Sequence, residues 1–308
     1  MKKVFIDGSA GTTGLRIVDR LSMRDDVELI VLDEDKRKDA QERKNALNNC
    51  DVAILCLPDA AAQEAVGMID NPDVVVIDTS TAHRTAEGWT YGFAELTGID
   101  AIANSKRIAN PGCHASGFIA LVKPLVDAGI LDKSIALTCW SVTGYSGGGK
   151  KMIEQYESGD DSTLMSSPAQ YALSQSHKHL KEMKSVTRIE FSPSFYPIVA
   201  PFYSGMEVCV PLFAKDIKAS VNEIKQVYRK TYSQGLVSFC DDMSDGGFIY
   251  ANKLSGADNM LVSVAGNEER VSLIALYDNL GKGASGSAIE NLNIVLGQDI
   301  TKGLIIKR

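Results

Sequence analysis

The 308-residue sequence lacks several features that would assign a protein to a class at once. No apolar run approaches the roughly 20 residues that a membrane-spanning helix needs. Acidic residues outnumber basic ones, 39 to 32, whereas a general role on nucleic acid or anionic membranes calls for a basic surface. The opening "MKKVFIDGS" enters a strand-like pattern at once and has no signal-peptide apolar region. We therefore expect a soluble protein of the cytoplasm with no nucleic-acid or membrane partner.

Cysteine and histidine are sparse and scattered. The six cysteines include no C-x-x-C pair, and with the four histidines they form no cluster at the spacing of a zinc site. Cys56 and Cys209 lie inside apolar strand-like runs, where a thiol behaves as a small hydrophobic side chain. We expect neither a disulfide framework nor a bound metal.

Two patterns divide the sequence. Residues 1–112 alternate helix-like segments with short apolar runs such as "KVFIDG", "DVAILCLP" and "VVVIDTS", which is typical of a parallel sheet with crossover helices. Residues 113–283 begin with a long helical pattern and continue with a polar segment, 150–184, that is predicted helical, and with strand-like runs such as "MEVCVPLF". The predicted class is α/β. A Rossmann-type doubly wound domain covers 1–112, an α+β catalytic and oligomerisation domain covers 113–283, and a helix in 284–308 packs back on the first domain.

A glycine-rich turn follows the first predicted strand. Gly8, Gly11 and Gly14 form G-x-x-G-x-x-G, a variant of the dinucleotide-binding fingerprint, and a helix is predicted to start near Thr12. Small residues are needed because the backbone must approach a pyrophosphate closely, and the helix start offers free N–H groups and a positive dipole end. Thr12 and Thr13 can add hydroxyl donors. The place of the motif after a first strand favours a nucleotide cofactor over a structural turn.

The residues after the second predicted strand give conflicting signals about that cofactor. Asp33 lies close to the position of an acidic residue that holds the ribose 2′-hydroxyl of NAD, yet Arg37 and Lys38 follow closely and could bind the 2′-phosphate of NADP. We expect NADP, with Arg37 at the ribose. A solvated charge cluster in "DEDKRKDAQERK" is the alternative.

Cys113 differs from the cysteines of the strand-like runs. It follows a Pro111-Gly112 turn and precedes apolar residues at helical spacing, so it falls at a predicted helix N-terminus. Free N–H groups and the helix dipole stabilise a thiolate there, which favours a nucleophile over a packed core thiol. His114 is expected to point elsewhere, because consecutive helix positions do not share a face.

A nucleophilic cysteine needs an acid–base partner. His83 comes just after a strand of the predicted Rossmann domain, near the edge where ligands gather. His177 and His179 lie two positions apart in the predicted helical segment, so at most one of them is expected to face a given site. An exposed surface side chain is the alternative for each histidine.

Several motifs, in order and at compatible spacing, resemble the N-acetyl-γ-glutamyl-phosphate reductase family, in particular its shorter type. They include "KVFIDGSAGTTGL", "VIDTSTAHRT", "ANPGCHASGFIALVKPLV", "HKHLKEM" and "YDNLGKGASGSAIENLN", and the likeness spans almost the whole chain. The resemblance implies an NADPH-dependent reductive dephosphorylation of an acyl phosphate, N-acetyl-γ-glutamyl phosphate, to the semialdehyde. The reaction would pass through a cysteine thioester and belong to arginine biosynthesis.

The resemblance also implies roles for individual residues. Cys113 matches the nucleophile, and His177 or His179 of the H-x-H-x-x-E motif matches the acid–base group, with His179 slightly favoured. Arg84 and Asn110 are expected at the substrate, although an arginine that ties a loop down is an equal alternative for Arg84. The predicted cofactor contacts are Gly8, Ser9, Gly11, Thr12, Thr13, Gly14, Arg37, Ser80, Ser146, Gly147, Gly148 and Asn279.

Other interpretations stay open beside this one. Ser194 stands where longer relatives are expected to have histidine, and Lys181 where proline is usual. The alternative enzymes are aspartate-semialdehyde dehydrogenase and other acyl-phosphate reductases of the same fold. The histidine expected in the R-G-H setting of aspartate-semialdehyde dehydrogenase is absent from "FYSGMEV". An NADP(H)-sensing regulatory protein would need the glycine loop but no nucleophile. The second domain, with a sheet of its own, suggests a homodimer or homotetramer.

Overall fold

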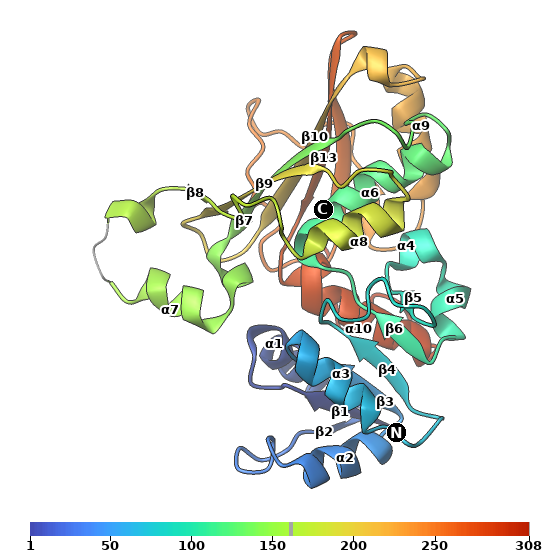
Figure 1. The fold of residues 1–308 in the computed structure, drawn as a ribbon, viewed down its shortest axis with the longest axis vertical. Coiled ribbons are helices and arrows are strands. Elements are labelled where there is room, and N and C mark those ends of the chain that lie inside the picture. The colour runs from blue at the N-terminus through green and yellow to red at the C-terminus, as the bar shows by residue number, and fades with distance from the viewer. Residues whose placement is uncertain (160–162, 308) are drawn as a thin grey trace. The chain divides into compact units, whose positions relative to one another are not determined.

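The computed structural model describes residues 1–159 and 163–307, which fall into two compact units. The first unit contains Met1–Gly112 and Ala284–Leu304, and the second contains Cys113–Gly283 and the tail from Ile305. Figure 1 traces the chain through both units. Within the described ranges, no helix combines the length and the apolar character that crossing a membrane requires.

A parallel sheet of six strands forms the centre of the described first unit, in the order β2-β1-β3-β4-β6-β5. Its strands are β1 (Lys2–Asp7), β2 (Val27–Ile30), β3 (Val52–Leu55), β4 (Val75–Asp78), β5 (Thr90–Tyr91) and β6 (Arg107–Ala109). The helices are α1 (Thr12–Leu21), α2 (Ala40–Asn48), α3 (Asp59–Gly67), α4 (Ala94–Thr97), α5 (Ile99–Ala103) and the C-terminal α10 (Gly286–Val295). Because β2 and β3 lie on opposite sides of β1, the strand order reverses between β1 and β3. Open α/β sheets bind ligands at such a reversal.

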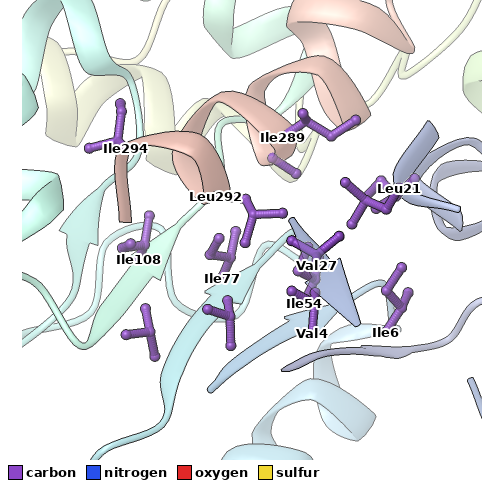
Figure 2. Close-up of a cluster of buried hydrophobic side chains, with 14 of the residues drawn as sticks. Val4, Ile6, Leu21, Val27, Ile54, Ile77, Ile108, Ile289, Leu292 and Ile294 are labelled. Carbon is purple, nitrogen blue, oxygen red and sulfur yellow. The ribbon is translucent and has the colours of Figure 1, made fainter. Parts of the chain in front are cut away.

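Apolar strands that are buried on both faces hold the first unit together. On one face, Val4 and Ile54 pack in the same cluster as Leu292 of α10, and Figure 2 shows α10 running along this cluster. On the other face, Phe5 and Ala53 pack with apolar residues of α2 and α3. The unbroken apolar runs of the sequence therefore correspond to strands with two covered faces.

A mixed sheet of seven strands forms the described second unit, in the order β11-β12-β13-β10-β7-β9-β8. Its strands are β7 (Thr138–Gly144), β8 (Ala169–Gln170), β9 (Ser194–Ala200), β10 (Met206–Phe213), β11 (Val237–Phe239), β12 (Met260–Gly266) and β13 (Arg270–Tyr277). The helices are α6 (Cys113–Asp127), α7 (Lys150–Glu157), α8 (His179–Thr187) and α9 (Val221–Thr231). Helix α6 packs on β10 and β13, with α8 and α9 beside it (Figure 1). The predicted α/β class, with a doubly wound domain and a mixed second domain, is confirmed.

The prediction of a helical segment over 150–184 is wrong for much of its described length. Helix α7 ends at Glu157, and the chain then runs through the edge strand β8 and an irregular stretch before α8 begins at His179. Gln175 has a φ of 55°, outside the helical region. Its side chain bonds both the N–H and the carbonyl of Phe195 on β9, at 2.8 and 2.7 Å. A tertiary contact with a neighbouring strand thus decides the structure of a segment whose polar composition suits a helix.

Candidate active site

Two of the three fingerprint glycines are required by the chain's own packing. A Cβ on Gly8, which has a φ of +86°, would lie 2.3 Å from the carbonyl oxygen of Cys56, and a Cβ on Gly14 would lie 2.4 Å from that of Gly8. A Cβ on Gly11 would meet only the Gly8 oxygen, at 3.6 Å, which is an ordinary contact. The fold itself therefore does not need glycine at position 11. A bare backbone there suits the close approach of a ligand.

The start of α1 offers hydrogen-bond donors beside this loop. Gly11 provides no side-chain cap, and no described residue bonds the buried hydroxyl oxygen of Thr12. Ser9 and Thr13 are half-buried in the same turn. N–H groups at a helix start and nearby hydroxyls are the donors that a pyrophosphate accepts. The residues present at the strand-order reversal thus fit a dinucleotide cofactor.

Arg37 lies in the turn after β2, where its guanidinium pairs with the exposed carboxylate of Glu34. A solvent-exposed pair of this kind contributes little to stability, so the guanidinium can exchange partners at small cost. Such an exchange is what binding of a ribose 2′-phosphate by Arg37 would need. The contact itself stays a prediction.

The loop after β4 is built around a buried carboxylate. Asp78 accepts hydrogen bonds from the N–H and the hydroxyl of Ser80, at 2.9 and 2.7 Å, and its other neighbour is the ring Nδ1 of His83 at 2.7 Å. The His83 ring stacks on Trp89, with centroids 4.0 Å apart. Ser80 and His83 therefore shape this loop at the edge of the sheet where ligands gather, and a cofactor contact of Ser80 stays a prediction.

Arg84 connects that loop with the segment before Cys113. Its buried guanidinium donates from Nε to the carbonyl of Asn110, at 2.9 Å, and from Nη2 to the carbonyl of Thr79, at 2.8 Å. The Asn110 side chain is fully buried and accepts a hydrogen bond from Asn291 of α10 at 3.1 Å. These are the contacts of an arginine that ties a loop down. Substrate contact by Arg84 or Asn110 stays a prediction.

Cys113 is the first residue of α6, so its predicted place at a helix N-terminus is confirmed. It is a half-buried free cysteine, and all six cysteines are free. The phenol of Tyr277 donates to the Cys113 carbonyl at 2.6 Å and accepts the Gly117 N–H at 3.1 Å, which fastens the first turn of α6 to the end of β13. A Cβ on Gly283, in the π-helical turn Gly281–Ser285, would lie 3.0 Å from that of Cys113, so glycine lets this turn lie close to the cysteine.

Three histidine rings form a cluster, and one of them belongs to His114, the residue directly after Cys113. The ring centroid of His114 lies 5.5 Å from that of His177 and 5.6 Å from that of His179, and the last two are 4.7 Å apart. Two predictions are therefore wrong. His177 precedes α8 instead of lying within it, so its ring turns to the same side as that of His179. His114 does not point away from the site, because α6 packs directly on α8.

Burial keeps part of this cluster uncharged. It lowers the pKa of His114 to about 3, with the charges of His177 and Lys178 adding to the effect. It lowers the pKa of His177 to about 4, again with a contribution from Lys178. His177 Nδ1 accepts the backbone N–H of His179 at 3.2 Å, so the neutral ring caps the start of α8. The cap role of His177 favours the buried His179 as the acid–base group. No three His, Cys, Asp or Glu side chains among the described residues are arranged to hold a metal ion.

We expect the free energy of unfolding to fall as the pH drops from 6.5 toward 4, in part through His114. The folded-state pKa of His114 lies below the ordinary value near 6.5, so the unfolded chain takes up its proton first and the stabilisation present above pH 6.5 is lost progressively. Because of the fully buried His114, the free energy of unfolding changes by up to about 1.4 kcal/mol per pH unit in this range. Urea unfolding at stepped pH measures this slope.

A His114→Gln comparison isolates the contribution of the histidine. Glu207 on β10 acts in the opposite direction, because burial raises its pKa to about 7 and the folded state then gains its proton first on acidification. Glu207 is common to both proteins, so its effect cancels. If the free energy of unfolding fell equally for wild type and variant between pH 6.5 and 4, His114 would not contribute to the pH dependence, and the prediction would be wrong.

Four residues predicted to contact the cofactor lie in two neighbouring loops of the second unit: Ser146, Gly147, Gly148 and Asn279. The first three lie in a short 3-10 turn, Tyr145–Gly148, directly after β7. The Asn279 amide donates to the Ser146 hydroxyl at 3.0 Å and accepts the N–H of Gly205 at 2.9 Å. Both side chains are buried and hold the two loops together. Their predicted approach to the nicotinamide end of the cofactor is not tested by these contacts.

Three further residues adjoin these groups. Tyr277 bonds the Cys113 carbonyl, Tyr171 bonds the His114 ring, and Glu182 lies on α8 with His179. Burial raises the pKa of Tyr277, and the charges of Cys113, Cys139 and Glu182 add to the effect. Burial and the charge of Cys113 likewise raise the pKa of Tyr171. The spacing of His179 and Glu182 along one helix face could have indicated Glu182. The two tyrosines carry no such signal, because one lies in an irregular stretch and the other at a strand end.

Comparison with known proteins defines the class of this chain. Residues 3–105 match the family model described as semialdehyde dehydrogenase, NAD binding domain, and residues 113–279 match the one described as semialdehyde dehydrogenase, dimerisation domain. The chain belongs to the semialdehyde dehydrogenase family. Aspartate semialdehyde dehydrogenase II from Vibrio cholerae has a similar fold, with a TM-score of 0.74 at 17% identity over 96% of this chain and 98% of that one. The enzyme from Francisella tularensis gives a TM-score of 0.72 at 14% identity, covering 96% and 100% of the two chains.

Curated relatives narrow the family further. N-acetyl-γ-glutamyl-phosphate reductase 2 of a Nostoc species is 44% identical over 319 residues, covering 98% of this chain and 99% of its own. The reductases of Rhizobium meliloti and Burkholderia orbicola are 43% and 41% identical, each over 96% of this chain and 98% and 97% of their own. The resemblance inferred from the motifs is therefore confirmed, and the chain is a member of the N-acetyl-γ-glutamyl-phosphate reductase family.

Proposed function

We propose that this chain reduces N-acetyl-γ-glutamyl phosphate to N-acetylglutamate 5-semialdehyde and releases inorganic phosphate, with NADPH as the reductant, in arginine biosynthesis. The observation that carries the proposal is a half-buried cysteine at the start of α6, followed directly by a residue of the histidine cluster, in a chain that is 44% identical to a named reductase over nearly its full length. Membership of this enzyme family argues against the NADP(H)-sensing alternative.

Cys113 performs the first step. The N-terminus of α6 stabilises its thiolate, and Sγ attacks the carbonyl carbon of the acyl phosphate. The bond between that carbon and the phosphate oxygen breaks, phosphate leaves with the electron pair, and a thioester remains on Cys113. Backbone N–H groups of the first turn of α6 are donors for the oxyanion that forms on the way.

The chain's remaining tasks are to hold the cofactor and manage a proton. The loop Gly8–Gly14, with Thr12 and Arg37, holds NADPH, which when bound supplies hydride for the thioester carbonyl carbon. His179 moves a proton to and from the oxygen of the resulting tetrahedral species. When the carbon–sulfur bond breaks, its electron pair returns to Cys113 Sγ and the aldehyde leaves.

We also propose that the chain assembles as a homodimer or homotetramer in the cytoplasm. The support is the second unit, because residues 113–279 match a dimerisation domain. Closed two-fold symmetry is the commonest arrangement of such assemblies.

The reaction run backward tests the proposal. We expect NADP to be reduced when N-acetylglutamate semialdehyde and inorganic phosphate are supplied together, because phosphate is the acyl acceptor that releases the thioester. Leaving out phosphate should stop turnover after the enzyme is acylated. Aspartate semialdehyde with phosphate is the control substrate, and turnover with it but not with the acetylated compound would assign the chain to the alternative enzyme.

A further inference from the structure

The buried ring of His114 joins two hydroxyl groups. Its Nδ1 lies 2.7 Å from Oγ of Ser141 on β7, and its Nε2 lies 2.6 Å from the phenol oxygen of Tyr171, directly after β8. The exposed fractions of His114 and Ser141 are 3% and 0%. Ser141, His114 and Tyr171 thus form a continuous hydrogen-bonded chain, whose middle member is the residue after Cys113.

The direction of the hydrogens in this chain follows from the partners of Ser141. A neutral imidazole has one N–H donor and one acceptor nitrogen. Among the described residues, His114 is the only hydrogen-bond partner of the Ser141 side chain. If Nδ1 carried the hydrogen, the buried Ser141 hydroxyl would have no acceptor for its own, and an unmet buried donor costs its full desolvation penalty. With Nδ1 as the acceptor, Ser141 donates to His114, and Nε2–H donates to Tyr171.

This arrangement leaves the phenolic hydrogen of Tyr171 available to another group. The pKa of Tyr171 is raised, first by burial and then by the charge of Cys113, so the phenol keeps its proton at neutral pH. The pKa of His114 is lowered to about 3, which keeps the ring neutral and its two nitrogens distinct. Tyr171 is therefore a hydrogen-bond donor held by the side chain of the residue that directly follows Cys113.

We propose that His114 is a positioning residue, whose Nε2–H, fixed by Ser141, holds Tyr171 so that the phenol donates to the oxyanion formed on the acyl carbon at Cys113. The identity of that oxyanion rests on the proposed function. The hydroxyl hydrogen of Ser141, the Nε2 hydrogen of His114 and the phenolic hydrogen of Tyr171 then all point in one direction, from β7 toward the oxyanion. Tyr171 touches the reaction, and His114 acts only through it.

A double-mutant cycle tests this coupling. Tyr171→Phe should lower kcat by about 100-fold with little change in KM, as expected for a donor used only in the transition state. His114→Phe should lower kcat by about 10-fold, and the double variant should be no slower than Tyr171→Phe alone, because the histidine acts through the phenol. Independent losses that multiply in the double variant would overturn the proposal.

Two variants control the cycle. His114→Gln keeps an amide donor within reach of Tyr171 and should recover most of the kcat lost in His114→Phe. Tyr250→Phe makes the same chemical change at a tyrosine that is 52% exposed and should retain wild-type kcat. No recovery in His114→Gln, in a folded protein, would count against the role of Nε2–H.

The imidazole nitrogen shifts of the wild-type protein give a readout that needs no substrate. Four histidines are present, and the spectrum of His114→Gln assigns the signals of His114. We expect a protonated Nε2 and an unprotonated Nδ1 at neutral pH, and a protonated Nδ1 would overturn the proposal whatever the activity. A wild type with the expected tautomer but no turnover in the backward assay would refute the proposed function and leave the positioning of Tyr171 intact.

Discussion

Cys113→Ser is expected to lower turnover by about 10⁴-fold or more, because a serine hydroxyl at the same helix start remains protonated and is a far weaker nucleophile than a thiolate. NADPH binding should be unchanged, since the glycine loop that fits the dinucleotide lies in the other unit of the chain. The backward assay measures turnover, and calorimetric titration with NADPH measures binding.

Cys240→Ser is the matched control for this variant. Cys240 is the other half-buried cysteine of the second unit, away from any helix start, with its thiol donating to the Asp242 carbonyl at 3.1 Å. It should retain turnover close to that of the wild type. Retained turnover in Cys113→Ser would remove the thioester from the mechanism.

His179→Asn is expected to lower kcat by about 10²- to 10³-fold, the usual contribution of a general acid–base group. His177→Asn should cost much less. The imidazole of His177 is already neutral and caps α8, and asparagine is a neutral side chain that caps helices well. The pair of variants therefore separates proton transfer from helix capping at two positions in one cluster.

The pH dependence of kcat gives a second measure of the histidine assignment. If His179 transfers the proton, its titration changes kcat with pH. That change should disappear from the pH profile of His179→Asn and remain in the profile of His177→Asn. Equal, small losses in the two variants would leave Cys113 without a histidine partner. A larger loss in His177→Asn would exchange the two roles.

Much of the first unit could be predicted from the sequence because its signals are local. Strands such as "DVAILCLP" are apolar along their length, and the alternation with helical segments predicts a parallel sheet before any contact is known. The place of Cys113 at a helix start was predictable for the same reason, since Pro111, Gly112 and the spacing that follows lie within one short stretch. The two-residue strand β5 carries too few residues to show a pattern.

The histidine cluster could not be predicted, because it depends on contacts between distant segments. His114 meets Ser141 from a strand 27 positions away and Tyr171 from an irregular stretch 57 positions away. The rule that neighbouring helix positions face different ways holds within α6, but α8 covers the side to which His114 points. The error for His177 has the same origin, since Gln175 bonds to Phe195 and ends any helix before that histidine.

The three glycines of the first loop meet different physical requirements. Replacing Gly8 or Gly14 brings a side chain into the backbone of the chain itself, so any lineage that keeps the fold must keep these two. Under the proposed function, Gly11 is required only by the nucleotide that binds next to it. A descendant that had given up the nucleotide could vary at position 11 while conserving positions 8 and 14, so the residue at position 11 would show whether a homologue still uses its cofactor.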